Sequence, residues 1–412
     1  MLQSITLEKA AAIILDHALP TGTEKVCVTE SFERILAEDI EAEFPLPPFR
    51  RTPLDGFALR AADTAGASTD EPIILRVVQT VYAGEVPPNP LEAGEACAVT
   101  TGAPLPEGSD TVIKFEDVAQ EGNTIAVNRP LRAEDNVVSE GEDVALGEKV
   151  LEVGAHITPA VVGLLASLGS EKVRVFKKPR VAIVSIGDEL IGLGQPLKFG
   201  KIYNSNQYTL SAQVREAGGI PFLLGTIPDD TGAIAATLKQ ASDEYDLIIT
   251  TGGASVGRKD LVKEAIRVSG ARILFWKVGI QPGTPVVCGE KNGKLIVGLS
   301  GNPSAATITF LLLARPAIRT MAGYKTVNLP EVCALMDQPF NKTSKHRRFL
   351  RATVTWENGA YHAVPAGIQS PGALKSMVLC NALVSMPPGH GPLQRAEEVA
   401  AILLPASYCL RG

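Results

Sequence analysis

The feature that most constrains the fold is a short apolar run that ends in a glycine-rich turn. Leu247-Ile248-Ile249 precedes Thr250-Thr251-Gly252-Gly253-Ala254-Ser255-Val256-Gly257, and Asp260 follows. An uninterrupted apolar run is typical of a strand buried on both faces, and open α/β sheets bind ligands in the loops that follow such strands. The segment therefore predicts an α/β sheet with a ligand site at this turn.

The residue types in this turn favour an anionic ligand. Glycines let backbone N–H groups approach an anion closely, and the hydroxyls of Ser255 and the threonines add donors. Asp260 can hold a divalent cation beside that anion. The pattern is neither the dinucleotide fingerprint G-x-G-x-x-G nor a P-loop, because no Gly-Lys-Ser/Thr follows. We expect an enzyme that handles a phosphorylated or oxyanionic ligand.

The bulk properties narrow the class of protein. A chain of 412 residues is expected to form roughly two to four domains. Its net charge of −6 argues against nonspecific binding to nucleic acid. The six cysteines form no C-x-x-C pair, the N-terminus has no basic and apolar signal sequence, and no apolar stretch approaches ~18 residues. We therefore expect a cytoplasmic protein with reduced thiols and no membrane partner.

The N-terminal part of the chain contains a predicted helix, a stiff linker and a β module. Helical spacing runs from Thr6, which can cap the helix, to about His17. The proline-dense segment 44–49 predicts an extended linker. Short alternating apolar runs broken by Gly and Pro fill residues 72–130, which is typical of an all-β module. Residues 140–178 return to helical character.

The middle of the chain alternates between strands and helices. Val181–Ser185, Leu247–Thr250 and Ile296–Leu299 are apolar runs that end in Gly-containing loops, with helical segments between them. This alternation predicts a doubly wound parallel sheet. Because the carboxyl ends of parallel strands lie along one edge, we expect the three loops to lie there together. After about Lys325 a strand-like pattern predicts a small β domain.

Two polar features support the same site, and each has a plainer alternative. Gly187-Asp188-Glu189 ends the first of these strands, and its carboxylates can hold Mg²⁺ beside a phosphate. Alternatively, Asp188 caps the next segment and Glu189 is solvated. Lys277 is an isolated cation in an apolar stretch, so it can reach an anionic ligand or extend to solvent.

Three further motifs have both a structural and a functional interpretation, and for the first of them, the segment around Asp55, the structural one is favoured. Asp55, between Pro53 and Gly56, is typical of a turn. Thr100-Thr101-Gly102 either contacts phosphate through its hydroxyls or joins two strands. His346-Arg347-Arg348 with Arg351 is the densest basic cluster, and guanidinium groups suit tetrahedral oxyanions, but a charged strand face has the same pattern.

Taken together, these segments resemble one family, the molybdopterin molybdenumtransferases, which include bacterial MoeA and the gephyrin E domain. The matches run in order along the whole chain, and such a series is specific to one family. The matching residues are Pro45-Leu46-Pro47-Pro48-Phe49, Asp55-Gly56-Phe57-Ala58, Thr101-Gly102-Ala103-Pro104, Gly141-Glu142-Asp143, Gly187-Asp188-Glu189-Leu190, Asp229-Asp230, Gly252-Gly253-Ala254-Ser255-Val256-Gly257 with Asp260, Trp276-Lys277, Pro282-Gly283 and Gly301-Asn302-Pro303.

The resemblance implies a multidomain fold that combines α/β and β structure, assembled as a homodimer. It has a doubly wound molybdopterin-binding α/β domain with a discontinuous helical domain, an inserted β domain and a C-terminal β domain. The implied boundaries are 1–45 and 140–178 for helical domain I, 46–139 for β domain II, 179–325 for α/β domain III and 326–412 for β domain IV. The implied cleft lies between domain III of one subunit and domain II of the other.

The resemblance also implies a reaction and a set of residues. Molybdate enters adenylylated molybdopterin with the help of Mg²⁺, and AMP leaves, which is metal-assisted cleavage of a phosphoanhydride coupled to oxyanion capture. The implied catalytic residues are Asp55, Thr101, Asp143, Glu189, Asp229 or Asp230, Asp260 and Lys277. The implied cofactor-binding residues are Ser185, Gly252, Gly253, Ser255, Gly257, Gly301, Asn302, Pro303 and Arg351. Glu189 and Asp260 are the implied metal ligands, and Lys277 lies on the anion side.

The chain departs from the family pattern in its anion-binding loops. Ile186 replaces a threonine, Gln281 and Thr284 replace two lysines, and Ala305 replaces a serine. Ser300 also differs from the family's proline, and the segment 50–54 differs from its Asp-Asn-Ser-Ala-Met. Losing a lysine from an oxyanion site removes a charge-assisted hydrogen bond worth roughly 1.5–3 kcal/mol, which Arg50, Arg51 or Ser304 could offset.

These departures leave two alternative functions open. One is a divergent paralogue that acts on another oxyanion, such as tungstate, or on another pterin. The other is a non-catalytic molybdopterin-binding scaffold, although a scaffold does not need Glu189 and Asp260 together. Candidate protein partners are the molybdopterin adenylyltransferase and apo-molybdoenzymes. Either Ser370 or Ser376 matches the family's ligand-contacting serine.

Overall fold

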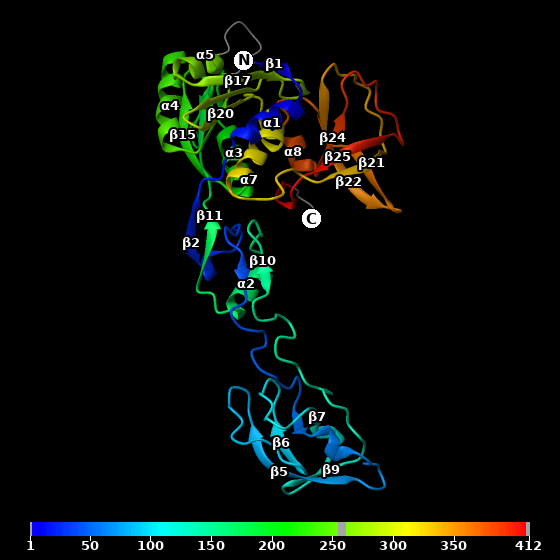
Figure 1. The fold of residues 1–412 in the computed structure, drawn as a ribbon. Helices are drawn as coiled ribbons and strands as arrows, with labels where there is room; N and C mark the ends of the chain where they lie inside the picture. The colour runs from blue at the N-terminus through cyan, green and yellow to red at the C-terminus, as the bar shows by residue number, and fades with distance from the viewer. Residues whose placement is uncertain (1, 254–260, 409–412) are drawn as a thin grey trace. The chain divides into compact units, whose positions relative to one another are not determined.

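The chain forms two compact units in a computed structural model that describes residues 2–253 and 261–408 (Figure 1). Unit 1 consists of Met1–Ala37, Gly154–Thr158 and Val173–Gly412, and unit 2 of Glu38–Val153 and Pro159–Lys172. Each unit has its own sheets and its own apolar clusters. No helix of the described residues is long and apolar enough to cross a membrane.

A seven-stranded sheet organises most of unit 1. Its strands, in spatial order, are β1 (Leu2–Ile5), β17 (Arg272–Val278), β19 (Val287–Lys291), β20 (Lys294–Leu299), β16 (Leu247–Thr251), β12 (Arg180–Ile186) and β15 (Ile220–Ile227). The last four run parallel, as the apolar runs predict. β19 is antiparallel to both neighbours, so the sheet is mixed rather than wholly parallel.

Helices cover both faces of this sheet, because alternate residues of its central strands face two different cores. Ile183 and Ile249 belong to the larger apolar cluster, whereas Ala182 and Ile248 belong to the smaller one. The α-helices that contribute to the larger cluster are α1 (Leu7–His17), α3 (Asn206–Glu216), α6 (Pro303–Thr309) and α7 (Arg315–Met321), together with Met377 of α8 (Lys375–Leu379). Those of the smaller cluster are α4 (Thr231–Glu244) and α5 (Leu261–Val268). This arrangement confirms the predicted doubly wound fold.

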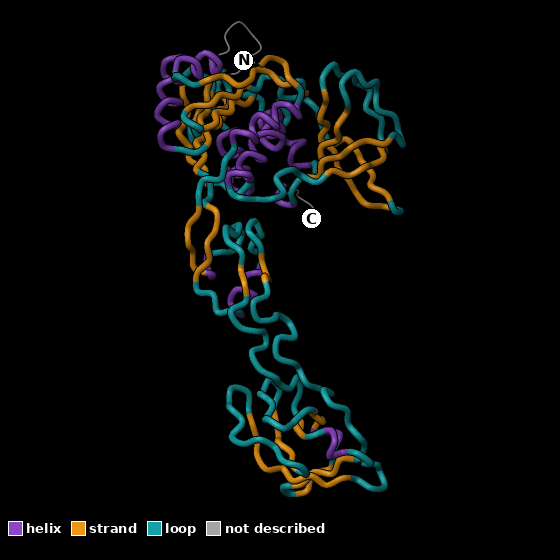
Figure 2. Tube along the Cα trace, in the orientation of Figure 1, coloured by secondary structure: helices purple, strands orange, loops and turns teal. Residues whose placement is uncertain are grey.

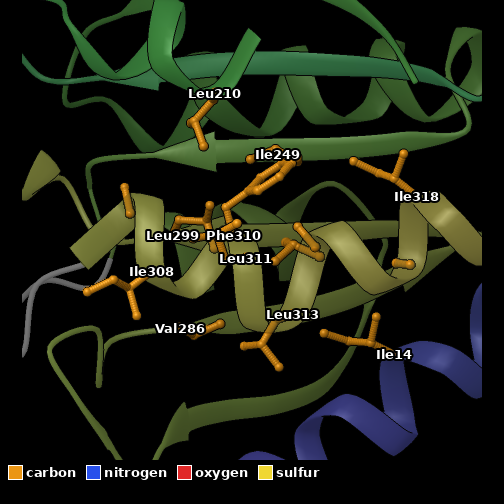
Figure 3. Packing of buried hydrophobic residues seen from close by; sticks show 14 of the residues in the cluster. Ile14, Leu210, Ile249, Val286, Leu299, Ile308, Phe310, Leu311, Leu313 and Ile318 are labelled. Carbon is orange, nitrogen blue, oxygen red and sulfur yellow. The ribbon is translucent and has the colours of Figure 1, made fainter. Parts of the chain in front are cut away.

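The segment that joins α6 to α7 supplies much of the larger core. A π-helical turn, η4 (Phe310–Ala314), lies between the two helices, and nearly all its side chains are buried. Figure 3 shows Phe310 directed toward Ile249 of the sheet and Leu313 directed toward Ile14 of α1. The segment is apolar on all sides because it is enclosed between the sheet and α1.

The first seventeen residues, which we expected in a helical domain I, contribute to the α/β layers instead. β1 pairs in parallel with β17, and α1 packs against the larger core through Ala10 and Ile14. Thr6 caps α1 as predicted, since its hydroxyl accepts the Lys9 N–H at 3.3 Å. Next along the chain, β2 (Thr23–Cys27) forms a two-stranded sheet with β11 (Lys172–Phe176).

The C-terminal part of unit 1 is a small β barrel, as the sequence predicts. The strand order is β18 (Ile280–Gln281), β22 (Arg347–Glu357), β23 (Ala360–Pro365), β21 (Glu331–Met336), β25 (Glu398–Leu403) and β24 (Ala382–Met386). β24 also pairs with β22, so five of these strands close on themselves. Met336, Leu350 and Val384 fill the interior, and α8 (Lys375–Leu379) precedes β24.

Unit 2 contains the predicted β module, visible in Figure 2 as strands and loops with little helix. Its six-stranded sheet has the order β7 (Thr111–Lys114), β4 (Gly56–Leu59), β6 (Glu95–Val99), β5 (Ile73–Val81), β9 (Thr124–Val127) and β8 (Ala119–Glu121). The rest of the unit holds β3 (Ile40–Glu41), β10 (Lys149–Leu151) and α2 (Pro159–Ser167). Short 3-10 helices in the chain span Val28–Glu30, Ala61–Thr64, Phe115–Asp117 and Ala406–Tyr408.

Candidate functional site

A cleft of about 730 Å³ lies at the carboxyl edge of the seven-stranded sheet. It is lined by Ile186, Gly187, Glu189, Ile202, Asp229, Gly252, Gly253, Leu261, Pro285, Ser300, Gly301, Asn302 and Pro303. The loops after β12, β16 and β20 therefore meet at one edge, as predicted from their neighbouring parallel strands. The predicted site residues that come together here are Glu189, Asp229, Gly252, Gly253, Gly301, Asn302 and Pro303.

The glycines of the cleft are required because these loops touch one another. Gly252 and Gly253 have φ of +90° and +63°, a region that favours glycine. A Cβ on Gly252 would collide with the Ile186 carbonyl oxygen, and a Cβ on Gly301 would lie 3.2 Å from the Gly252 Cα. The buried Ile186 side chain lies directly against Gly253. Ile186, which stands where the family has a threonine, therefore provides an apolar surface against which the turn packs.

One side chain, Asn206, ties two of these loops together, and the sequence analysis did not identify it. Its Nδ2 donates to the Thr251 Oγ1 at 2.8 Å and to the Gly301 carbonyl oxygen at 2.9 Å. Thr251 in turn donates its hydroxyl to the Ser300 carbonyl oxygen at 3.0 Å. The sequence feature that could have identified Asn206 is the Asn-Ser-Asn run at the start of α3, because side chains of this kind readily form hydrogen bonds with nearby backbone groups.

Ser185, a predicted cofactor-binding residue, is fully buried beneath the cleft. Its hydroxyl donates to the Asn204 Oδ1 at 3.1 Å, and the Asn204 Nδ2 donates to the Thr226 Oγ1 at 3.0 Å. This network joins β12 to β15 through the residue that leads into α3. Ser185 is therefore placed to support the cleft rather than to face it.

The carboxylates of the cleft come from Glu189 and Asp229, both exposed to solvent. Gly187 has φ of +150°, a backbone conformation that favours glycine, and the Glu189 carboxylate lies close against it. The Asp230 side chain instead caps α4, because its Oδ1 accepts the Ala233 N–H at 2.7 Å. Of the two adjacent aspartates, Asp229 is the one that lines the cleft.

Of the two predicted metal ligands, Glu189 and Asp260, the structure describes only Glu189. Asp260, Ser255 and Gly257 lie outside the described residues. Within residues 2–253 and 261–408, no group of three or more His, Cys, Asp or Glu side chains could hold a metal ion by itself. Mg²⁺ often takes only one or two protein carboxylates and completes its shell with water and phosphate oxygens, so Glu189 and Asp229 fit that requirement.

Lys277 is the next-to-last residue of β17 and is absent from the described lining of the cleft. Its ammonium nitrogen lies 4.2 Å from the centroid of the Trp276 ring, and that of Lys263 lies 4.0 Å from the same ring. Such contacts are attractive because the indole face is electron-rich. The Lys277 backbone has φ of +64°, which is uncommon for a residue with a side chain.

Arg351 lies behind the cleft wall and is fully buried. Its Nη1 donates to the Ser304 Oγ at 2.8 Å, and Ser304 follows Pro303 of the cleft lining. Burial lowers the pKa of the Arg351 guanidinium. Of the two candidate serines, Ser370 contacts this guanidinium through its carbonyl oxygen, whereas the Ser376 hydroxyl donates to the Ala373 carbonyl oxygen at 2.6 Å.

Gln281, which replaces a family lysine, bonds to the β barrel. Its Oε1 accepts from the Arg348 Nη2 and from the Ser344 Oγ, each at 2.8 Å. Thr284, at the other replaced lysine, donates its hydroxyl to the Ile280 carbonyl oxygen at 2.6 Å. Both polar side chains are therefore engaged within the protein, and Arg348 already brings a positive charge to position 281.

Unit 2 carries a second group of predicted residues. The Asp55 Oδ1 accepts the Thr101 N–H at 2.6 Å and the Thr101 hydroxyl at 2.9 Å. These bonds, the backbone one first, lower the pKa of Asp55 below its ordinary value. Asp143 is exposed, and its N–H donates to the Leu46 carbonyl oxygen at 2.9 Å. Asp55 and Thr101 are therefore in direct contact, which the sequence analysis, treating the two motifs separately, did not anticipate.

Three family models match consecutive parts of the chain. The MoeA N-terminal region (domain I and II) matches residues 5–169, the probable molybdopterin binding domain matches 182–320, and the MoeA C-terminal region (domain IV) matches 334–404. All the residues that line the cleft described above fall within the second of these regions.

Several proteins resemble the chain over nearly its whole length. A molybdopterin molybdenumtransferase of Bacillus subtilis (strain 168) is 36% identical over 410 residues, which cover 97% of this chain and 95% of that protein. Another from Staphylococcus aureus (strain MRSA252) is 34% identical, with the same coverage. The crystal structure of the molybdopterin biosynthesis MoeA protein from Pyrococcus horikoshii OT3 has 33% identity and a TM-score of 0.83, covering 97% of this chain and 100% of that one.

Replacing Gln281 by lysine is expected to destabilise the protein. A lysine would remove the acceptor of two hydrogen bonds and place a cation beside Arg348, so we expect a loss of about 1–3 kcal/mol in the free energy of unfolding. Gln281→Glu is the matched control, because it keeps an acceptor and adds a charge that attracts Arg348. Urea denaturation measures both, and equal stability of the lysine and glutamate variants would contradict this account.

The Asp55 carboxyl group is expected to titrate at a lower pH than an ordinary aspartate. Hydrogen bonds from Thr101 favour the charged form, so the proton binds only as the pH falls further. Thr101→Val removes the hydroxyl but keeps the N–H, and should raise the pKa of Asp55 part of the way back. Thr100→Val is the control, since the Thr100 hydroxyl bonds to the Ala83 N–H instead. Carbon-13 NMR of the carboxyl groups measures the titration midpoint of Asp55. An unchanged midpoint in Thr101→Val would contradict this account.

Proposed function

The chain belongs to the molybdopterin molybdenumtransferase family, and we propose on that basis that it inserts molybdate into adenylylated molybdopterin with release of AMP. This is a transferase step of molybdenum cofactor biosynthesis. The observation that carries the proposal is the cleft at the sheet edge, where glycine turns and two exposed carboxylates lie together. Such a surface suits a phosphorylated substrate and its counter-ion.

The glycine turns are proposed to bind the phosphate groups of the substrate. Without side chains at Gly252, Gly253 and Gly301, a phosphate can approach the backbone closely. Asn206 holds the loops that contain Thr251 and Gly301 at a fixed separation, so the phosphate meets a preformed surface. Asn302 and Pro303 continue this wall toward the buried Arg351.

The carboxylates of Glu189 and Asp229 are proposed to hold Mg²⁺, with Asp260 as a further candidate. When bound, Mg²⁺ supplies positive charge that stabilises the phosphate group released as the phosphoanhydride bond breaks. Gly187 is proposed to matter indirectly, because the Glu189 carboxylate lies close against it and its backbone conformation favours glycine. Lys277 remains a candidate for the anion side of the site.

The Asp55 and Thr101 pair of unit 2 is proposed to act from a second copy of the chain in a homodimer. Bonds from Thr101 lower the pKa of Asp55, which makes its carboxylate a weaker base than an ordinary aspartate. We therefore assign it to orienting the threonine hydroxyl rather than to removing a proton from the substrate. Sedimentation equilibrium tests the dimer directly, and a mass of one chain at micromolar concentration would refute it.

A related function on a different oxyanion has one observation in its favour. Neither Gln281 nor Thr284 offers a positive charge, and both bond within the protein. An enzyme for tungstate or for another pterin would differ from its relatives at such positions. A purely scaffolding role is less well supported, since Glu189 and Asp229 are both exposed in the cleft.

Release of AMP tests the proposal. The purified protein is given adenylylated molybdopterin and Mg²⁺ with molybdate, with tungstate, or with neither oxyanion. We expect AMP to appear in a molybdate-dependent manner together with a molybdenum-loaded product. A requirement for tungstate would favour the paralogue, and substrate binding without AMP under any condition would favour the scaffold.

Two adjacent aspartates are expected to respond differently to the same substitution. Asp229→Asn removes a cleft carboxylate and should lower the rate of AMP release by roughly 100-fold or more. Asp230→Asn keeps a side chain that also caps helices well, so its rate should stay close to that of the unmodified protein. Single-turnover assays compare the rates, and melting curves confirm that both variants are folded. The reverse order of effects would remove Asp229 from the proposed site.

A further inference from the structure

An exposed apolar loop begins and ends at the cleft, and we call its residues 192–201 the flap. Every residue of the flap is exposed to solvent. Three of them are large and apolar: Leu193 and Leu197 are 59% and 60% exposed, and Phe199 is fully exposed. Large apolar side chains that gather on a protein surface in this way indicate a binding surface, because their exposure to water is unfavourable.

Both ends of the flap are fixed at the cleft. β13 (Leu190–Ile191) precedes the flap and β14 (Ile202–Tyr203) follows it, and these short strands pair with each other. Glu189 and Ile202 belong to the cleft lining, and the Ile202 N–H donates to the Glu189 carbonyl oxygen at 2.9 Å. Because Phe199 lies so near Ile202 in the chain, their Cα atoms are within roughly 10 Å of each other. The apolar loop is therefore close enough to reach the cleft.

Few contacts hold the flap in its exposed position. The Gln195 carbonyl oxygen accepts the Tyr203 hydroxyl at 2.8 Å, and the Lys198 carbonyl oxygen accepts the Lys201 N–H at 3.0 Å. The apolar side chains of the flap belong to neither core of the α/β layers. A loop with so few buried contacts moves at little cost in free energy. Gly200, whose φ is +80°, gives it a backbone position that tolerates such a change.

The cleft itself offers no surface on which a flat ring can stack. Its described lining consists of glycines, small polar and aliphatic side chains and two carboxylates, without an aromatic ring. The segment 254–260, which lies outside the described residues, has no aromatic residue in its sequence either. Sites for ring-shaped ligands are usually lined by apolar and aromatic side chains. Phe199 is aromatic, fully exposed and attached to the rim of this cleft, so an inward movement of the flap supplies such a ring.

We infer that the flap closes over the bound substrate and that Phe199 stacks on its pterin ring. The phosphate groups of the substrate then lie on the glycine turns, and the leucines of the flap help to keep water from the covered ring. Phe199 is thus a substrate-contacting residue that favours the pterin substrate over the AMP product. This inference rests on the proposed function for the identity of the substrate, and adds how the organic part of that substrate is held.

Removing the ring of Phe199 should weaken the binding of a pterin and leave the binding of AMP unchanged. Anaerobic equilibrium dialysis of the full chain measures this with two separate probes, molybdopterin and AMP, since AMP has a phosphate and an adenine but no pterin. We expect Phe199→Ala to raise the dissociation constant for molybdopterin by roughly threefold to tenfold, because one stacked ring is lost. Phe199→Tyr keeps the ring and should bind as the unmodified protein does.

Phe32→Ala is the matched control, because Phe32 is also exposed (50%) and is absent from the described cleft lining. It should leave both dissociation constants unchanged. Unchanged binding of molybdopterin by Phe199→Ala would overturn the inference. An equal loss of affinity for AMP would overturn it as well, because the ring would then not be specific for the pterin. Melting curves check the fold of each variant, and the full exposure of Phe199 predicts an unchanged melting temperature for Phe199→Ala.

Hydrogen–deuterium exchange of the unmodified protein tests the closure without any variant. Molybdopterin should decrease deuterium uptake in peptides that contain residues 192–201. Unchanged or increased uptake there would overturn the inference. Low uptake without ligand that rises when the protein is diluted would also overturn it, because the flap would then lie in an interface between two copies of the chain.

Failure of this inference can be told apart from failure of the proposed function. If AMP release depends on molybdate but Phe199→Ala binds molybdopterin as tightly as the unmodified protein, only the flap is refuted. If Phe199→Ala weakens molybdopterin binding as expected but the unmodified protein releases no AMP from adenylylated molybdopterin, the flap is supported and the transferase reaction is refuted.

Discussion

The cleft depends on the close approach of three loops at one edge of the seven-stranded sheet. Gly252 meets the backbone of Ile186 and of Gly301 so closely that a single Cβ would force the loops apart. Neighbouring parallel strands bring the loops to the same edge, and glycine lets them touch. Asn206 then fixes the separation with two hydrogen bonds. Backbone packing, more than any charged side chain, shapes this surface.

Electrostatic contacts link the sheet to the β barrel behind that surface. Arg351 reaches from the barrel to Ser304 next to the cleft wall, and Gln281 of β18 bonds to Arg348 of the neighbouring barrel strand β22. Neither arginine has a carboxylate partner among the described residues, and burial lowers the pKa of both guanidinium groups. This part of unit 1 therefore concentrates positive charge within a protein whose net charge is −6. An anionic substrate is the natural complement of such a region.

The departures from the family pattern have structural explanations. Ile186 is buried against the glycine turn, Gln281 bonds to the barrel, and Ala305 is buried with its N–H directed to the Pro371 carbonyl oxygen at 3.4 Å. The serine missing at position 305 has a neighbour, Ser304, whose hydroxyl contacts Arg351. Each of these residues makes contacts of its own in this chain, so their substitution does not by itself imply a lost site.

The sequence by itself determined the elements and the edge at which their loops meet. Apolar runs such as Leu247–Ile249 specify buried strands, and the glycines that follow specify turns, because both depend on local composition and spacing. Side-chain partners could not be read in this way. Only the tertiary structure showed that Asp230 caps a helix while Asp229 faces the cleft, that Ser185 is enclosed, and that the segment 367–372 covers Arg351. The Ser185 and Arg351 contacts join residues that are well separated in the chain, and the cap at Asp230, although local, could not be told from a cleft position at Asp229 without the fold. Which side chain meets which is thus decided by packing rather than by sequence spacing alone.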